Sequence, residues 1–230
     1  MSFLWEVVRD ALEVLGAFGS ELREVLWLTL VVSVAATAIG VVVGVPLGIA
    51  LGLSRTRRWL TTAFVNTGMG MPPVLAGLLL LLLLWRDGPL GSWGLLFTPA
   101  AMVIAQALLA IPIAAGVTAG AVRGLTPDAH EQLRALELTR PQRYRIAGVE
   151  VWPGVAAATA AAFGRVLSEV GAVLVVGGNI EGETRVLTTA IVQESRQADF
   201  GAALALGVVL LGMAFAVNLV LTWTQVREQT

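Results

Sequence analysis

Long runs without a charged residue constrain this 230-residue chain more than any other feature of its sequence. Four such runs stand between charged segments, and a fifth apolar block is interrupted by only two ionisable residues. A helix needs about 20 apolar residues to cross a hydrocarbon core of about 30 Å, so each block can cross a membrane once. The sequence predicts five transmembrane helices, over about 25–54, 59–85, 97–122, 151–176 and 200–226.

The composition agrees with this class and excludes several others. Hydrophobic residues make up 57% of the chain and charged residues 13%, unlike an ordinary soluble domain. Cysteine is absent and His130 is the only histidine, so we expect no disulfide, no thiol nucleophile and no metal site. The sequence therefore predicts an all-α membrane protein.

The arginines predict how the chain is oriented. The short loop 55–58 holds three arginines and no acid, the segment 123–150 holds five more, and Arg227 follows the last block. On the opposite side, the loop 177–199 holds four acids and two arginines. Because positively charged loops stay in the cytoplasm, we expect the N-terminus outside and the C-terminus inside.

The first 24 residues form a separate segment. Apolar residues recur there at helical spacing among the acids Glu6, Asp10 and Glu13, without the basic region of a secretory signal. The pattern predicts an amphipathic helix over residues 1–24. This helix either lies in the extracytoplasmic membrane interface or packs along the helix bundle.

The segment 123–150 is the largest polar stretch between the apolar blocks. It is too charged to lie in hydrocarbon and long enough to form short helices. Leu133 and Leu136 fall on one helical face with Ala129. A polar loop exposes such a face where a partner covers it, although these leucines could instead pack against the chain's own span ends. We expect a cytoplasmic loop that couples the membrane part to a soluble partner.

The second apolar block contains glycines and prolines in its middle. It reads Gly-Met-Gly-Met-Pro-Pro over residues 68–73. Pro72 and Pro73 remove two backbone donors and oppose a continuous helix. Irregular backbone at membrane depth is tolerated where it is buried in protein or faces water. The block is either a broken span beside a pathway or a span with a simple proline kink.

Two ionisable residues interrupt the block 151–180. Arg165 and Glu169 are four residues apart, so on a continuous helix they share one face and can form an ion pair. Ionisable residues within a span are costly and face a bundle interior or an aqueous cavity. With the neighbouring Ser168, they either lock two helices together or line a transport pathway.

No enzyme motif is present. A Gly-x-x-x-x-Gly-Lys loop is absent, so we do not expect the chain to bind ATP by that route, and residues 164–169 lack the glycine spacing of a nucleophile elbow. The distribution of the arginines is explained by membrane topology rather than by nucleic-acid binding.

A secondary transporter would carry intramembrane carboxylates and a repeat, but only Glu169 is available and no repeat is seen. A non-transporting scaffold would need neither a broken span nor a docking loop. Partner-driven transport is the leading interpretation.

The order of these elements resembles the permease subunits of type I ATP-binding-cassette importers. In that family a cytoplasmic loop carries an EAA motif, whose short coupling helix sits in a cleft of the ATPase. The matching stretch here is 126–139, in which Glu131 matches the motif glutamate and Glu137 stands where the family usually has glycine. Without that glycine, the sequence does not fix the residue at which the coupling helix ends. The resemblance assigns ATPase contact to Ala129, Glu131, Leu133, Ala135, Leu136 and Glu137.

A second resemblance concerns the substrate. Residues 164–172 and 177–185 look like the signature of permeases for the oxyanions molybdate, tungstate and sulfate. Residues 66–73, 97–102 and 186–191 are closest to the tungstate branch. The resemblance covers nearly the whole membrane part of the chain. It implies import of tungstate, with molybdate or sulfate as the alternative substrate.

The family resemblance also implies the partners. Two copies of the chain would form the pathway in the inner membrane of a prokaryote, and two ATPase subunits would bind the cytoplasmic loops. ATP and Mg²⁺ would be held by those ATPases, with no cofactor and no catalytic residue on this chain. An extracytoplasmic binding protein would deliver the oxyanion, and the paired bundles would alternate between inward-open and outward-open states.

The loop 177–199 is the candidate outer gate. Its apolar stretch 186–192 is too short to span a membrane and is expected to form a re-entrant or interfacial helix. Thr188 and Thr189 would offer neutral hydroxyl groups to a passing anion, unless this helix only caps the bundle. Asn179, which lies in the oxyanion signature, is a further pathway candidate.

Overall fold

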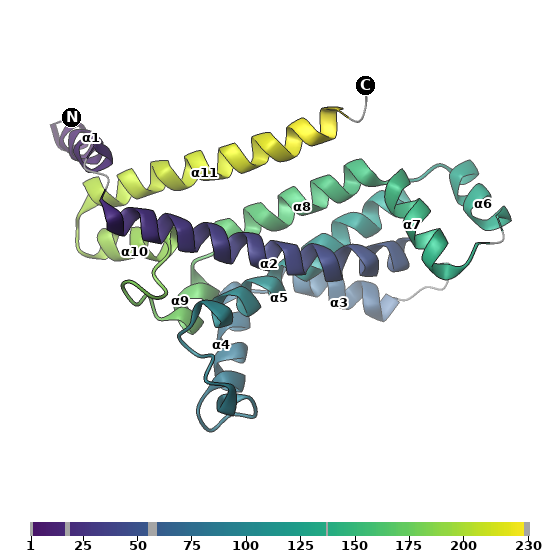
Figure 1. The fold of residues 1–230 in the computed structure, drawn as a ribbon, viewed down its shortest axis with the longest axis horizontal. Helices are drawn as coiled ribbons and strands as arrows, with labels where there is room; N and C mark the ends of the chain where they lie inside the picture. The colour runs from purple at the N-terminus through teal and green to yellow at the C-terminus, as the bar shows by residue number, and fades with distance from the viewer. Residues whose placement is uncertain (1, 17–18, 55–58, 137, 228–230) are drawn as a thin grey trace. The chain divides into compact units, whose positions relative to one another are not determined.

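The computed structural model describes residues 2–16, 19–54, 59–136 and 138–227. Over those ranges the chain is helical and contains no strand, as the apolar blocks predict. Figure 1 shows the order of the elements. The α-helices are α1 Ser2–Gly16, α2 Ser20–Gly52, α3 Trp59–Met69, α4 Pro73–Leu84, α5 Pro99–Arg123, α6 Pro127–Ala135, α7 Arg140–Glu150, α8 Trp152–Leu167, α9 Gly171–Gly177, α10 Leu187–Arg196 and α11 Phe200–Arg227, and the 3-10 helix η1 is Gly91–Trp93.

Three helices are long and apolar enough to cross a membrane by themselves. They are α2, α5 and α11, the last of them over Phe200–Val220. Pro46 and Pro112 lie within α2 and α5, and both helices continue through them. Two further pairs of helices qualify only if each bent pair is one span, which gives up to five spans. The predicted number of five therefore stays a prediction.

Both bent pairs turn sharply. The axes of α3 and α4 differ by 101° across the break at Gly70, Met71 and Pro72. The axes of α7 and α8 differ by 78° at Val151. A proline kink bends a helix far less than 101°, so the Pro72–Pro73 sequence separates two helices rather than kinking one.

Two element bounds differ from the sequence prediction. The block 151–176 was expected to be one continuous helix, whereas α8 ends at Leu167 and α9 begins at Gly171. The N-terminal helix was expected over residues 1–24, whereas α1 ends at Gly16 and α2 begins at Ser20. Glu21 therefore lies in the first turn of the long α2 helix, where its charge suits the positive end of the helix dipole.

The chain divides into two compact units. One, called the first unit, contains Met1–Ala35, Pro73–Gln106 and Leu167–Val220. The other, called the second unit, contains Ala36–Pro72 and Ala107–Val166 together with the C-terminal end of the chain. The sequence order is therefore interleaved, and both α2 and α5 contribute residues to each unit.

The second unit is built around close contact of α2 with α5. Glycines recur at every fourth position of α2, at Gly40, Gly44, Gly48 and Gly52. A Cβ atom added at Gly44 would lie 2.6 Å from the Ile111 carbonyl oxygen and 2.7 Å from the Ala114 Cβ atom. Only glycine permits this approach, as at other small-residue helix interfaces in membranes. A buried cluster of Leu51, Val65, Ala115 and Ala119 packs beside this contact.

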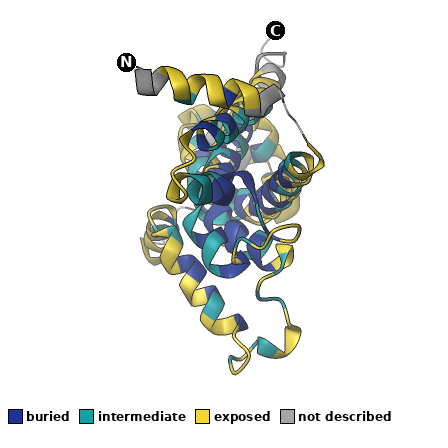
Figure 2. Cartoon of the chain, turned by 90° about the vertical axis from the view of Figure 1, so that its left-hand side faces the viewer, coloured by how far each residue is buried: buried dark blue, intermediate teal, exposed yellow. Residues whose placement is uncertain are grey.

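In the first unit, α4 packs against the short helix α9. A Cβ atom added at Gly77 would lie 2.8 Å from the Ala172 Cα atom, so these two helices also touch through small residues. The opposite face of α4 carries exposed leucines, among them Leu79 and Leu82. Figure 2 shows that individual helices carry both exposed and buried residues.

Candidate functional site

The helix α6 lies within the polar segment 123–150, where the coupling helix was predicted. The hydroxyl oxygen of Thr126 accepts a hydrogen bond from the Ala129 N–H at 3.2 Å, and Pro127 occupies the first turn. Thr126 is therefore the N-cap of α6, and the fixed φ angle of Pro127 favours its first helical turn. The helix ends at Ala135, and Leu136 adopts extended backbone angles. The helix thus ends without the glycine that the family resemblance led us to expect nearby.

Most of the predicted coupling residues lie on this accessible helix. Glu131 and Ala135 are exposed, Ala129 is half-buried, and the side chain of Leu136 is 51% exposed. The backbone of Leu133 is helical, but its side chain and the whole of Glu137 lie outside the described residues. The described side chains therefore leave α6 open for contact.

The helix α7 joins this loop to the buried core of the second unit. Its N-terminus is closed by Thr139 and Gln142, because the Thr139 N–H and hydroxyl donate to the Gln142 side-chain oxygen at 2.9 and 2.8 Å. Its Ala147 is fully buried in a cluster with Ile49, Val122, Val151 and Val155. Because the N-terminus of α7 follows α6 closely, this cluster fixes the base of the coupling loop.

An open groove runs along the exposed side of α7. Its volume is about 330 Å³, and Val149 is 71% exposed. The groove is lined by Leu138, Gln142, Arg145, Ile146, Val149 and Glu150. Such apolar exposure on a polar loop agrees with a surface that meets another phase or another protein.

The ionisable residues of the block 151–180 are arranged differently from the prediction. Because α8 ends at Leu167, Arg165 and Glu169 do not share a face of one continuous helix. Glu169 is 6% exposed, and its carboxylate accepts hydrogen bonds from the N–H groups of Gly171 and Ala172 at 2.7 and 3.2 Å. Glu169 thus caps the first turn of α9. Arg165 is half-buried and Ser168 is exposed.

A helix does form at the predicted outer gate, but its threonines face the protein. Thr188 and Thr189 in α10 are 4% and 1% exposed. The Thr188 hydroxyl donates to the Glu169 carbonyl oxygen at 3.0 Å. The Thr189 hydroxyl donates to the Val186 carbonyl oxygen at 3.0 Å and accepts from the Val186 N–H at 3.1 Å. In this conformation neither threonine keeps a donor for an anion.

The loop between α9 and α10 is tied by polar side chains. The Thr184 hydroxyl donates to the Gly177 carbonyl oxygen at 2.6 Å and accepts from the Ile180 N–H at 2.9 Å. Asn179 adopts a left-handed backbone conformation, with φ of 54°, and its amide donates to the Gln193 side-chain oxygen at 2.6 Å. This hydrogen bond joins the loop to α10, and the pathway role of Asn179 stays a prediction.

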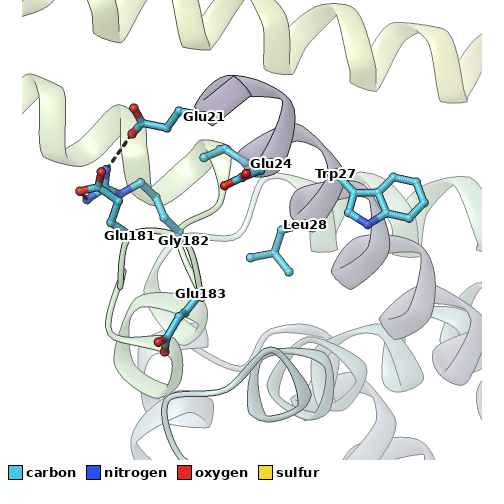
Figure 3. A pocket seen from close by; sticks show the side chains of 9 residues that line it. Glu21, Glu24, Trp27, Leu28, Glu181, Gly182 and Glu183 are labelled. Atoms are coloured by element: carbon cyan, nitrogen blue, oxygen red, sulfur yellow. Dashed lines mark hydrogen bonds and ion pairs between the residues drawn. The ribbon is translucent and has the colours of Figure 1, made fainter. Parts of the chain in front are cut away.

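The pocket beside this loop is acidic. It has a volume of about 230 Å³, and Figure 3 shows its carboxylates gathered around the start of α2 and the loop. Arg185 lies 3.4 Å from Glu21 and 3.3 Å from Glu181, while Glu24 and Glu183 add two further negative charges. Two of these carboxylates pair with the Arg185 guanidinium group, and the net negative charge of the lining disfavours an anion in this pocket.

Sequence reasoning missed Thr29. This residue lies in the long apolar run of α2, yet its hydroxyl accepts a hydrogen bond from the Leu187 N–H at 2.9 Å and donates to the Val25 carbonyl oxygen at 2.6 Å. The only signal was a polar residue among apolar ones, and its partner lies 158 positions along the chain. The loop-closing role of Thr184 was also missed, although its partners Gly177 and Ile180 are only seven and four residues away.

Comparison with known proteins places the chain among transport proteins. Residues 24–227 match the family of binding-protein-dependent transport system inner membrane components. The chain is 38% identical to the tungstate uptake system permease protein of Peptoclostridium acidaminophilum, covering 96% of this chain and 97% of that protein. It is 42% identical to a probable anion ABC transporter permease protein of Haloferax volcanii, over 69% of this chain and 71% of that protein.

A solved structure shows the same fold. The crystal structure of an amino acid ABC transporter with histidines superposes with a TM-score of 0.60, covering 88% of this chain and 92% of that chain. The sequence identity of 17% makes this a similarity of fold alone. The comparison therefore supports the helical architecture of the chain and nothing beyond it.

Proposed function

The chain belongs to the family of binding-protein-dependent transport system inner membrane components, and from that premise we propose that it is the membrane subunit of an ATP-driven importer of tungstate. The subunit itself is not an enzyme, because in this family the ATPase is a separate chain. Its task in the proposed function is to provide the route for the anion and to transmit the action of the ATPase to that route.

The assignment of tungstate as the substrate rests on sequence similarity over almost the whole chain. The tungstate uptake permease of Peptoclostridium acidaminophilum aligns with 96% of this chain at 38% identity. An alignment of that extent includes the helix break at Pro72–Pro73 and the loop between α9 and α10. Irregular backbone of this kind is tolerated at membrane depth where it lines a water-filled pathway.

The transport route in this proposal lies between two copies of the chain. Five spans place the N-terminus outside and the C-terminus in the cytoplasm, as the arginine distribution supports. The anion arrives on an extracytoplasmic binding protein, which supplies most of the selectivity. The acidic pocket around Arg185 supports this division of labour, because its negative charge disfavours capture of a free anion there.

Coupling to the ATPase is assigned to α6. The helix is exposed, is capped by Thr126 and is followed by a braced α7, so a push on it reaches the buried cluster around Ala147 and Val122. ATP-driven closure of two ATPase subunits moves the two α6 helices, and the membrane helices switch between inward-open and outward-open states. This transfer needs rigid packing at the base of the loop, as the cluster supplies.

The coupling assignment predicts the effect of Leu136→Asp. Because Leu136 is 51% exposed, the substitution leaves the fold intact but places a charge where an apolar contact is proposed. We expect ATPase co-purification to fall at least about tenfold, which corresponds to about 1.4 kcal/mol, and uptake to fall with it. Leu136→Met is the control and should behave as the parent protein. Normal ATPase recovery with Leu136→Asp would exclude this contact.

The substrate is tested by uptake into vesicles that contain this chain, the ATPase and the binding protein. We expect ATP-dependent accumulation of tungstate that molybdate inhibits more than sulfate does. An ATPase variant unable to hydrolyse ATP is the control. Preferential accumulation of molybdate or sulfate would assign the alternative substrate of the same family, and accumulation without ATP would contradict an ATP-driven importer. Calorimetry of the three anions with the binding protein measures where selectivity arises.

A further inference from the structure

The N-terminal helix α1 has three distinct faces. Trp5, Val8 and Leu12 follow one another at spacings of three and four residues and therefore lie on one face. Their side chains are 72%, 40% and 64% exposed, although all three are large and apolar. Figure 2 shows this helix as the mostly exposed segment at the N-terminus. Exposed apolar side chains in such a row indicate that another phase or another molecule covers them.

A second face of α1 is charged. Glu6, Arg9 and Glu13 repeat the same spacing one residue further along, and Arg9 lies 3.7 Å from both Asp10 and Glu13. The side chains of Arg9, Asp10 and Glu13 are each more than half exposed. Apolar and charged faces side by side are the pattern of a helix that lies in a membrane surface.

The third face holds α1 against the start of α11. Ala11 is 5% exposed, and a Cβ atom added at Gly201 would lie 2.7 Å from the Asp10 Cβ atom. Gly201 is the second residue of α11, whose segment Phe200–Val220 is long and apolar enough to cross a membrane. The helix α1 thus packs at the point where this span begins, which is the depth of a membrane surface.

The helix α11 also has an exposed apolar stripe. Leu204, Val208 and Leu211 recur at helical spacing and are 41%, 50% and 70% exposed. Within a span such a stripe faces acyl chains or another span. Trp5 adds an amphipathic ring, the side chain that is enriched where a protein crosses from acyl chains to headgroups.

We propose that α1 is a membrane-surface helix whose Trp5–Val8–Leu12 face enters the boundary between phospholipid headgroups and acyl chains. Its Ala11 face holds the start of α11 at the same depth. Three acids and one arginine lie on the remainder of the helix, so attraction to anionic headgroups does not drive the contact. Binding through apolar burial is therefore expected to be no stronger in anionic bilayers than in zwitterionic ones.

Single cysteines test the proposal, because the chain contains none of its own. Val8→Cys and Leu12→Cys carry a nitroxide label on the proposed lipid face, and Glu6→Cys and Glu13→Cys are matched controls on the charged face. Each variant is reconstituted into phosphatidylcholine vesicles, and collision of the label with oxygen and with a water-soluble nickel chelate is measured. We expect oxygen to dominate at positions 8 and 12 and nickel to dominate at 6 and 13.

Two results would overturn the proposal. Nickel collisions that dominate at all four positions would place α1 in water. Exclusion of both reagents from positions 8 and 12 would show that a protein surface, such as a second copy of the chain, covers the face. Adding Leu12→Glu to the Val8→Cys variant is expected to raise nickel collisions at position 8. These measurements require no transported anion, so they stand or fall separately from the substrate assignment.

Discussion

The Thr189 side chain performs two tasks with one hydroxyl group. It accepts a hydrogen bond from the Val186 N–H and donates to the Val186 carbonyl oxygen, and it is 1% exposed. A buried N–H without a partner costs about 1–3 kcal/mol, so this residue decides whether the first turn of α10 is stable. The sequence predicts this position as a donor to the transported anion, and in this conformation its hydroxyl group is used within α10.

We expect Thr189→Val to lower the free energy of unfolding by about 1–2 kcal/mol, because the isosteric side chain removes the hydroxyl that caps α10. Thr189→Ser keeps the hydroxyl and is expected to lose well under half as much. Thermal unfolding in detergent, followed by circular dichroism, measures both variants. Equal loss of stability in the two variants would show that methyl packing, and not the hydrogen bonds, matters at this position.

Individual residues show where sequence reasoning reached its limit. The Thr126 cap and Pro127 start α6 through local chemistry, so the helix could be predicted within its polar segment. Glu169 could not be assigned, because its role depends on where α8 ends, and no proline or glycine marks Leu167 as that end. Thr29 and Leu187 are partners through tertiary packing alone, which leaves no trace in either local sequence.

At the scale of elements, glycine sets how closely α2 and α5 approach. Gly48 lies against the Ala115 carbonyl oxygen, at 2.5 Å from where a Cβ atom would stand, and Gly44 meets Ile111 in the same way. Between membrane helices the hydrophobic effect is weak, so van der Waals contact over this close interface supplies much of the attraction. The repeat of glycine at every fourth residue is therefore an interface signal.

We expect Gly44→Ala to destabilise the protein by about 1–3 kcal/mol, because the new methyl group would overlap Ile111 and Ala114. Gly120→Ala is the matched control. It is also within a helix of the second unit, and no atom lies within 4 Å of its added Cβ atom. This control is expected to be neutral or to stabilise by up to about 1 kcal/mol through helix propensity. A Gly44→Ala variant as stable as Gly120→Ala would contradict the close contact.

The elements themselves were more predictable than their angles. Apolar length located α2, α5 and α11, and the paired prolines located the break before α4. The bends of 101° and 78° could not be predicted, because a proline shows only that a helix stops and tertiary packing decides where the next one points. The division of the block 151–176 into α8 and α9 depends on the Glu169 cap, which becomes visible only in the folded chain.

For the whole molecule, the distribution of arginine is the main support for the proposed orientation. The loop 55–58, with three of the arginines, lies outside the described residues, so the orientation rests on sequence. The described acids Glu181 and Glu183 lie in the loop assigned to the opposite side. An asymmetry of this kind is established during insertion, when basic loops remain in the cytoplasm.

We expect cysteines at positions 57 and 134 to react with a membrane-impermeant thiol reagent only after cells are opened. Cysteines at positions 13 and 183 are expected to react in intact cells, because these positions are assigned to the outside. The parent chain has no cysteine and serves as the blank. Reaction at position 134 in intact cells would reverse the orientation, and with it the assignment of α6 to the ATPase.

The length of α2 makes the protein sensitive to its host membrane. The helix has 33 residues and is about 50 Å long, whereas the hydrocarbon core is about 30 Å thick. It must tilt or extend beyond the core, and the angle depends on bilayer thickness. Longer acyl chains make the helix stand more upright, and shorter ones increase its tilt. Because the Thr29 hydroxyl of α2 accepts the Leu187 N–H, we expect a change in lipid chain length to be transmitted to the start of α10.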